Sequence, residues 1–214
     1  MSTGEVVADD SAARQVAERV YGERFETISQ YVDILTSRGI EWGLLGPREP
    51  ERIWTRHILN SAAMESLLPR GASVMDLGSG AGLPGLPLAI LRPDLRVVLV
   101  ESLQRRATFL QLAVDELGLS DRVDVVRGRA EETRLAVDVV ACRAVAPLDK
   151  LVRWSAGHFL PDGQLMALKG DRAEQDLADA AVELKRRKLR GEVLTVRADQ
   201  LADPTQVVVV RRAV

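Results

Sequence analysis

From Ser73 onward, the sequence alternates short apolar runs, rich in β-branched residues, with longer amphipathic segments. The runs predict seven strands, at Ser73–Leu77, Arg96–Val100, Val123–Val126, Val137–Ala141, Gln164–Leu168, Val193–Val196 and Val207–Val210. Helical patterns lie between most of them, at Gly85–Leu91, Leu103–Leu117, Leu148–Phe159 and Glu174–Leu189. Because strand–helix alternation produces right-handed crossovers, we expect an α/β fold with a mostly parallel sheet. No helical pattern separates the last two runs, which therefore predict an antiparallel C-terminal hairpin.

The first 70 residues carry helical patterns and no strand pattern. Apolar residues recur at helical spacing from Ser11 to Arg38, and Gly39 follows as a stop signal. A second helix is predicted from about Pro50, which suits a first turn, to Pro69. We therefore expect an N-terminal helical cap (residues 1–70) on an α/β domain (residues 71–214), the two forming one compact unit of ordinary domain size.

Composition narrows the function only weakly. The chain has 29 basic and 31 acidic residues, and an enzyme acting on nucleic acid needs only a local basic face. The single cysteine, Cys142, excludes an internal disulfide, and the two histidines, His57 and His158, lack the spacing of metal ligands. No apolar stretch reaches the ~18 residues of a membrane span, and Met1–Gln15 lacks the apolar core of a secretory signal. We expect a cytoplasmic protein without a metal.

The strand at Ser73–Leu77 leads into a glycine-rich turn, in which residues 76–85 read D-L-G-S-G-A-G-L-P-G. One register, Gly80-x-Gly82-x-x-Gly85, satisfies the dinucleotide fingerprint. That fingerprint places its first glycine directly at the end of the strand, whereas Gly80 lies four residues past Asp76. Pro84 also removes an amide from the helix N-terminus, where a pyrophosphate needs donors.

A second register, an acid followed by glycines at every second position, resembles the loop by which methyltransferases hold S-adenosylmethionine. This cofactor has no phosphates and carries an ammonium and a sulfonium cation, so a nearby carboxylate favours its binding. The register predicts a cofactor-binding loop formed by Asp76, Gly78, Ser79, Gly80 and Gly82.

The ends of the following strands supply further candidates. Glu101 ends the second strand at the distance at which an acid reaches a ribose, although an acid facing solvent would give the same pattern. Residues 127–132 follow the third strand, where such folds bring the backbone up to an adenine ring. Arg143 follows the fourth strand, in the crevice where open α/β sheets bind ligands.

Together these segments resemble the bacterial glucose-inhibited division protein B family. The resemblance rests on Arg56–Ser61, Asp76–Gly85, Arg92-Pro93, Glu101-Ser102, Arg105-Arg106, Arg129–Glu131, Arg143-Ala144 and Ala167–Gly170. It implies a Rossmann-like class I methyltransferase that methylates N7 of a guanosine in 16S ribosomal RNA. The partner would be the small ribosomal subunit or an assembly intermediate, and we expect a monomer. Asn60 and Leu44–Gly46 depart from the family pattern. These departures lie in the N-terminal segment that the resemblance places against RNA, and not in the cofactor loop.

The resemblance also assigns residues. It implies that the cofactor is bound by Gly78, Leu83, Ala130, Glu131 and Arg143. Guanine N7 carries a lone pair and no proton, so its methylation needs no general base. Catalysis is then expected to rest on proximity and orientation, with Arg143 as the candidate catalytic residue.

Four residues are candidates for substrate binding, namely Arg56, His57, Arg129 and Lys169. Structural alternatives remain open: His57 can be a packed or helix-surface residue, and Arg129 and Arg143 can pair with Glu131 and Asp76. The basic run Lys185–Arg190 fits a solvated helix C-terminus better than an RNA clamp. Other functions left open are a methyltransferase for another RNA or a small molecule, a nicotinamide oxidoreductase and a non-catalytic cofactor-binding regulator.

Overall fold

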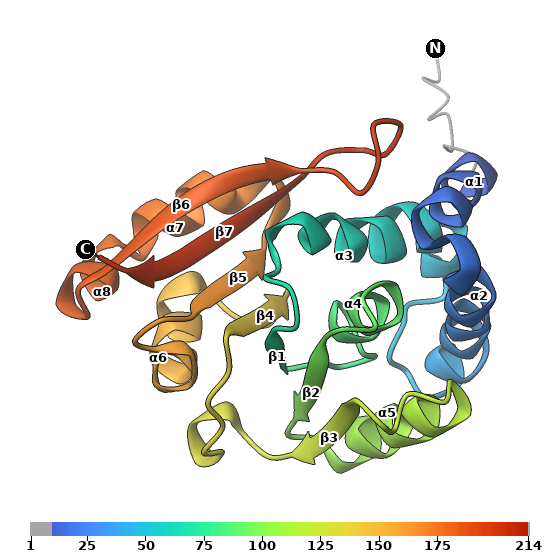
Figure 1. Cartoon of the computed structure of the whole chain (residues 1–214), viewed down its shortest axis with the longest axis horizontal. Coiled ribbons are helices and arrows are strands. Elements are labelled where there is room, and N and C mark those ends of the chain that lie inside the picture. Colours follow the sequence, from blue (N-terminus) through green and yellow to red (C-terminus); the bar gives the residue numbers. More distant parts are fainter. Residues whose placement is uncertain (1–9, 214) are drawn as a thin grey trace.

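The predicted strands pair into one twisted sheet, which the computed structural model describes over residues 10–213 (Figure 1). The predicted absence of a signal in Met1–Gln15 concerns mainly residues 1–9, which lie outside the described residues. The strands are β1 (Ser73–Leu77), β2 (Arg96–Glu101), β3 (Val123–Arg127), β4 (Val139–Arg143), β5 (Gln164–Leu168), β6 (Leu189–Val196) and β7 (Thr205–Arg212).

The strand order is β3-β2-β1-β4-β5-β7-β6. All neighbours pair in parallel except β7, which runs antiparallel to both β5 and β6. The strands that follow β1 are added on one side of it (β2, β3), and those from β4 onward are added on its other side. Open sheets of this kind bind ligands in the crevice at such a reversal, here between β1 and β4. The predicted α/β fold, with seven strands and an antiparallel C-terminal hairpin, is confirmed.

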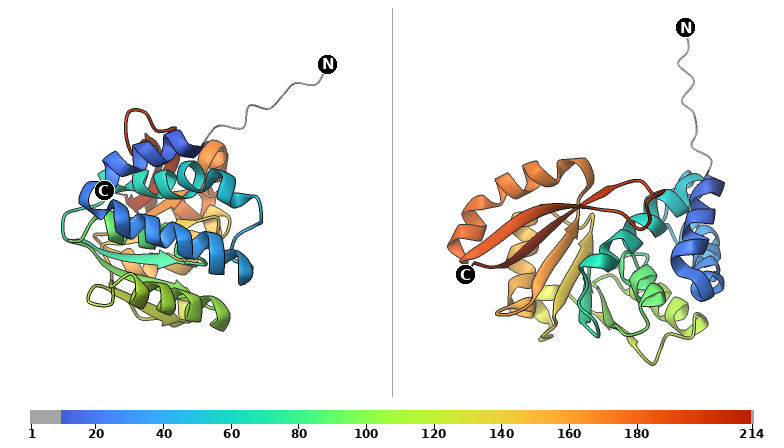
Figure 2. Two further views of the ribbon diagram at one scale, coloured as in Figure 1. Left: turned by 90° about the vertical axis from the view of Figure 1, so that its right-hand side faces the viewer. Right: turned by 45° about the horizontal axis from the view of Figure 1, so that its top comes forward.

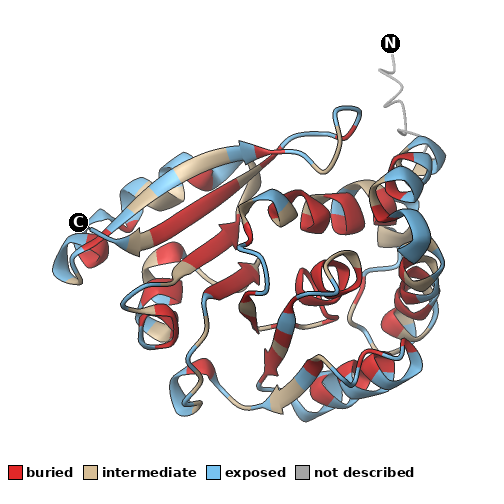
Figure 3. Ribbon diagram, viewed as in Figure 1, coloured by how far each residue is buried: buried red, intermediate tan, exposed pale blue. Residues whose placement is uncertain are grey.

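Two layers of helices cover the sheet (Figures 1 and 2). One face carries α1 (Asp10–Tyr21), α2 (Phe25–Ile34), α3 (Asn60–Ala62), α4 (Gly85–Leu91) and α5 (Gln104–Glu116). The other face carries α6 (Leu148–Phe159), α7 (Ala173–Asp179) and α8 (Ala181–Arg186). Each layer buries its own apolar core, and the central strands are buried on both faces, as the continuous apolar runs predict (Figure 3).

The N-terminal helices are more broken than their periodicity predicts. The helix expected over Ser11–Arg38 is interrupted at Gly22, whose φ of 52° ends the helical hydrogen-bond ladder. A 3₁₀ turn, η1 (Gly22–Arg24), precedes α2, and a π turn, η2 (Leu35–Gly39), follows it.

The second N-terminal segment is also a series of short turns. It comprises η3 (Glu49–Arg52, 3₁₀), η4 (Ile53–Leu59, π), α3 and η5 (Ala63–Leu67, 3₁₀). Asp10 caps η4 from a distance, because its carboxylate accepts hydrogen bonds from the amides of Trp54 (2.9 Å) and Thr55 (3.0 Å). The predicted N-terminal cap is therefore helical, but its helices are short and tied together by side chains.

Near the C-terminus, the helix expected over Glu174–Leu189 divides at Ala180 into α7 and α8. It ends at Arg186, and Lys188 adopts a φ of 56° that turns the chain into β6. Residues 189 and 190 therefore pair with β7 and do not continue a helix. The strands β6 and β7 are accordingly longer than predicted, and a 3₁₀ turn, η7 (Gly170–Arg172), connects β5 to α7.

Candidate functional site

The glycine loop is fixed to the neighbouring strand by its backbone. The amides of Gly78 and Ser79 donate to the carbonyl oxygen of Val100, at 2.9 and 3.1 Å. Gly78 has a φ of 71°, and a Cβ there would lie 3.0 Å from both Cγ atoms of Val145, which follows β4. Any side chain at this position would be strained and would crowd the gap between β1 and β4.

Asp76 lies at the end of β1 but faces the start of α4. Its side chain is fully buried, and Oδ2 accepts a hydrogen bond from the amide of Gly85 at 3.0 Å. Oδ1 has no hydrogen-bond partner among residues 10–213. Burial, reinforced by the neighbouring charge of Glu101, raises the pKa of Asp76 to about 7, although the hydrogen bonds and Arg143 act against this. The site therefore contains a carboxyl oxygen that the protein leaves unsatisfied.

Glu101 holds the glycine loop from the end of β2. One carboxylate oxygen accepts from the amide of Gly80 at 3.0 Å, and the other from the amide of Leu103 at 2.9 Å. The side chain is only 4% exposed, so the alternative of a solvent-facing acid is wrong. The predicted ribose contact stays a prediction, and it would have to share a carboxylate that already organises the loop.

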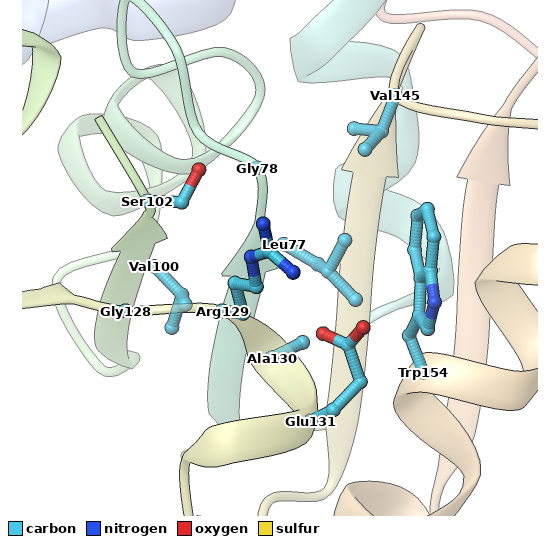
Figure 4. A pocket seen from close by; sticks show the side chains of 10 residues that line it. All are labelled: Leu77, Gly78, Val100, Ser102, Gly128, Arg129, Ala130, Glu131, Val145 and Trp154. Carbon is cyan, nitrogen blue, oxygen red and sulfur yellow. The ribbon is translucent and has the colours of Figure 1, made fainter.

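A cavity of about 290 Å³ opens at the carboxyl ends of β1 to β4 (Figure 4). Its lining residues come from all four strand ends and from α6: Leu77, Gly78, Val100, Ser102, Gly128, Arg129, Ala130, Glu131, Val145 and Trp154. The 3₁₀ turn η6 (Ala130–Glu132) brings Glu131 to this cavity from the segment after β3. The mixture of apolar walls and one carboxylate suits a nucleoside, whose base is flat and whose ribose has hydroxyl groups.

The sequence predictions for the cofactor divide between this cavity and the loop beside it. Gly78, Ala130 and Glu131 line the cavity, and so does Arg129, which the sequence places among the RNA contacts. The remaining cofactor candidates do not line it: Asp76, Ser79, Gly80, Gly82, Leu83, Glu101 and Arg143.

The far side of the loop is covered by an N-terminal helix. The hydroxyl of Tyr31 in α2 donates to the carbonyl oxygen of Ala81 at 2.8 Å, and Tyr31 itself is completely buried. Gly82 has a φ of 101°, and a Cβ there would lie 2.5 Å from Leu86 and 3.1 Å from the Tyr31 hydroxyl. Gly82 therefore serves the contact between the loop and α2 and α4.

Three predicted site residues meet at the end of β4. Arg143 donates from Nη1 to the backbone carbonyl of Arg56 at 3.2 Å, and its Nη2 makes a short contact with Nδ1 of His57. His57 is 5% exposed, so the structure selects the packed alternative over the helix-surface one. Arg143 forms no ion pair with a carboxylate among residues 10–213, so the structural alternative in which it pairs with Asp76 is wrong.

Lys169 lies apart from these groups, after β5. Its ammonium donates to the carbonyl oxygen of Ala146 at 2.9 Å and forms an ion pair with Asp176 at 2.9 Å. The side chain is 10% exposed, so Lys169 ties the segment after β4 to α7. Its predicted RNA contact would require these bonds to be exchanged.

Several residues of the site carry no sequence signal that assigns them to it. Trp154 lies within the amphipathic pattern of α6, where it is indistinguishable from a core residue, and Val145 follows β4 without a motif. Glu49 contacts His57 from a segment that shows only a helix start. These roles depend on contacts between distant segments, which a local pattern does not encode.

Comparison with known proteins assigns the family. The family described as rRNA small subunit methyltransferase G matches residues 24–202. The chain is 49% identical to the ribosomal RNA small subunit methyltransferase G of Mycolicibacterium paratuberculosis, over 97% of this chain and 85% of that protein. The protein of the same name from Thermobifida fusca is 50% identical over 86% of this chain and 76% of its own length. The chain belongs to this family.

Solved structures support the fold. The mitomycin 7-O-methyltransferase MmcR superposes with a TM-score of 0.59 at 22% identity, covering 72% of this chain and 53% of that chain. The M1A22 tRNA methyltransferase TrmK of B. subtilis superposes with a TM-score of 0.55 at 15% identity, covering 72% of this chain and 65% of its own. The match to the family and to its members confirms the predicted family, the methyltransferase class and S-adenosylmethionine as the cofactor.

Proposed function

We propose that this protein transfers the methyl group of S-adenosylmethionine to N7 of a guanosine in 16S ribosomal RNA. The observation that carries the proposal is the nucleoside-sized cavity at the switch point between β1 and β4 in a chain of this family. The ribosomal RNA of the small subunit is supported by the names of the family and of its members. The target atom is what the sequence resemblance implies.

The residues present fit this cofactor. The apolar walls and Glu131 would hold its adenosine, and the buried carboxyl group of Asp76, whose Oδ1 has no hydrogen-bond partner among residues 10–213, would favour a cation near the loop. Bound S-adenosylmethionine would supply an electrophilic methyl carbon. The carboxylate of Glu101, which holds the loop, and that of Glu131, which lines the cavity, place negative charge at the site, which suits a ligand with two cationic centres.

The chain's own contribution is to orient and enclose the reactants. Guanine N7 presents a lone pair and no proton, so no side chain has to act as a base. Arg143 retains guanidinium N–H groups that no residue among 10–213 accepts, and these can hold an acceptor oxygen of the target nucleotide. Arg56 is exposed beside it and can contact the RNA backbone, while Arg129 faces the cofactor cavity.

The remaining assignments are part of the same proposal. Residues 1–70 and 71–214 would act as one compact unit, since the described N-terminal helices share an apolar core with α4, α5 and one face of the sheet. The protein would work as a cytoplasmic monomer on the small subunit or an assembly intermediate. None of the described helices is long and apolar enough to cross a membrane, and no cluster of metal-ligating residues occurs within residues 10–213.

The test is methyl transfer from radiolabelled S-adenosylmethionine to purified small subunits, naked 16S RNA and large subunits in parallel. We expect label in 16S RNA, in a nucleoside that mass spectrometry identifies as 7-methylguanosine. Label confined to large subunits, or a different methylated position on 16S RNA, would contradict the proposal. Heat-denatured enzyme controls for transfer that does not depend on the fold.

A further inference from the structure

A chain of three side chains connects the N-terminal segment to the end of β4. Glu49 in η3 contacts His57 in η4, with 2.5 Å between Oε2 and Nε2. His57 in turn contacts Nη2 of Arg143 through Nδ1, and the carbonyl oxygen of Arg56 binds the neighbouring Nη1. Two acceptors in η4, Nδ1 of His57 and the carbonyl oxygen of Arg56, therefore bind two nitrogens of the Arg143 guanidinium.

The protons in this chain follow from the chemistry of its ends. An arginine side chain can only donate, so Nδ1 of His57 must accept and carry no proton. The remaining proton of a neutral imidazole then lies on Nε2, from which it is donated to the Glu49 carboxylate. The carboxylate thus selects the one tautomer in which His57 can bind Arg143.

The surroundings keep this arrangement through the neutral pH range. Burial and the charge of Arg143 lower the pKa of His57 to about 4, against the attraction of Glu49. Burial opposes ionisation of Glu49, but the hydrogen bond from His57 and the charges of Arg56 and Arg52 outweigh it and lower its pKa. The other titratable groups that face Arg143 are Tyr31 in α2 and Asp76 in β1.

The position of Arg143 makes its orientation consequential. The next residue, Ala144, has a φ of 53°, and Val145 then lines the cofactor cavity. Arg143 thus lies where the strand ends and the chain turns toward the cavity. A guanidinium fixed by two protein acceptors keeps its remaining N–H groups in one plane and one direction.

We propose that Glu49 and His57 are positioning residues, which fix the His57 tautomer and thereby the guanidinium plane of Arg143 for methyl transfer. This inference rests on the proposed function in assuming that Arg143 contacts the target nucleotide. The arrangement of Glu49, His57 and Arg143 itself can be tested without any substrate.

The substrate-free test is NMR of the ¹⁵N-histidine-labelled protein. We expect His57 to show the Nε2–H tautomer and no titration between pH 6 and pH 8. Glu49→Gln should weaken this tautomer preference, because an amide can either donate to or accept from Nε2. A wild-type His57 in the Nδ1–H form, or one that titrates near its ordinary pKa, would overturn the proposal.

The functional test is single-turnover methylation at saturating cofactor and saturating small subunits, so that any effect on RNA binding through the Arg56–Glu49 ion pair (3.5 Å) does not enter the rate. Glu49→Gln should lower the rate about tenfold, the size of losing one hydrogen bond to a charged group, with an unchanged cofactor Kd. Glu51→Gln is the matched control, because Glu51 is exposed in the same turn, and it should react at the wild-type rate. An unaltered rate in Glu49→Gln would overturn the proposal.

A double variant separates positioning from a general effect on folding. If Glu49 acts through Arg143, the Glu49→Gln change should cost nothing further in an Arg143→Ala background. Full multiplication of the two rate losses would contradict the proposal. A wild-type protein that does not methylate ribosomal RNA would refute the proposed function, while the NMR result would still decide on the arrangement of Glu49, His57 and Arg143.

Discussion

The cofactor cavity and the N-terminal segment meet at the ends of β1 and β4, but they are held in place in different ways. The loop after β1 is held by the strand directly beside it, β2. Its amides donate hydrogen bonds to the carbonyl oxygen of Val100 and to the carboxylate of Glu101. The N-terminal segment is fixed by side chains that reach across the fold, such as Tyr31 to Ala81 and Arg143 to the carbonyl oxygen of Arg56.

The cofactor side can be recognised from local sequence patterns, whereas the N-terminal side depends on contacts between distant residues. The cofactor side is a strand, a glycine turn and an acid at the next strand end, and each piece has a recognisable local pattern. The N-terminal side acquires its geometry only when residues 50 to 87 positions apart come together. We therefore expect substitutions on the two sides to separate into cofactor effects and rate effects.

The largest expected effect is on the cofactor side. Gly78→Val should abolish cofactor binding, because its Cβ would enter the gap beside Val145 at the edge of the cavity. The positive φ adds about 1–3 kcal/mol of backbone strain, so the melting temperature should also fall. Isothermal titration calorimetry with S-adenosylmethionine measures the first effect and thermal denaturation the second.

Gly118→Val provides a matched control for the strain. Gly118 has a φ of 65°, and nothing lies within 4 Å of a Cβ built there. It should lose stability without losing cofactor affinity. Normal binding by Gly78→Val would show that the loop does not approach the cofactor at this residue.

The next effect lies on the boundary between the two sides. Arg143→Ala should lower the single-turnover rate on small subunits by on the order of 100-fold, the usual cost of misplacing a reacting group. Arg143→Lys should recover little, because lysine lacks the planar fork that binds both His57 and the carbonyl of Arg56. A wild-type rate in Arg143→Ala at saturating cofactor would reduce Arg143 to a structural tie.

Arg56→Ala provides the contrast, since the side chain of Arg56 is exposed whereas Arg143 is half-buried. It should mainly raise the apparent KM for RNA, and the defect should grow with salt concentration if the arginine contacts phosphate. A kcat defect equal to that of Arg143→Ala would place both residues in one orienting group.

The same contrast decides what could be predicted from the sequence. The sheet, its hairpin and the glycine loop were predictable, because β-branched runs and a strand-end acid report local structure directly. The break at Gly22 was not, since an isolated glycine is compatible with a continuous helical pattern. The buried pairing of His57 with Glu49 was equally hidden, because a lone histidine beside an arginine reads as a surface or core residue.

A smaller effect concerns the acid that organises the loop. Glu101→Gln should weaken cofactor binding by about 1–3 kcal/mol, typical of losing a hydrogen bond to a charged group. The structure adds a second cause, because the carboxylate accepts from the amides of Gly80 and Leu103 and an amide NH₂ would face one of those donors. Calorimetry gives the Kd, and thermal denaturation without cofactor separates loop damage from a lost ribose contact. An unchanged Kd would exclude the ribose contact.

The smallest expected effect is the release of less than one proton per protein molecule when the cofactor binds, and it comes from Asp76. Burial raises the pKa of Asp76 to about 7, and its Oδ1 has no hydrogen-bond partner among residues 10–213. A bound cation would lower this pKa, so cofactor binding near pH 6.5 should release protons to the buffer. The binding enthalpy should then differ between buffers of different ionisation enthalpy, and Asp76→Asn should remove that difference. A buffer-independent enthalpy in the wild type would place the cation elsewhere.

The cofactor-free protein should show the same group through its stability. A raised pKa means that the folded state binds more protons than the unfolded state between the usual carboxyl pKa of 3.8 and about 7. The free energy of unfolding contributed by Asp76 therefore falls as the pH rises through this window, and it is fully present only below it. Wild type should lose stability relative to Asp76→Asn between pH 4 and pH 7, as urea denaturation at each pH would measure. A constant difference between the two proteins would mean that Asp76 is already ionised in the fold throughout this window.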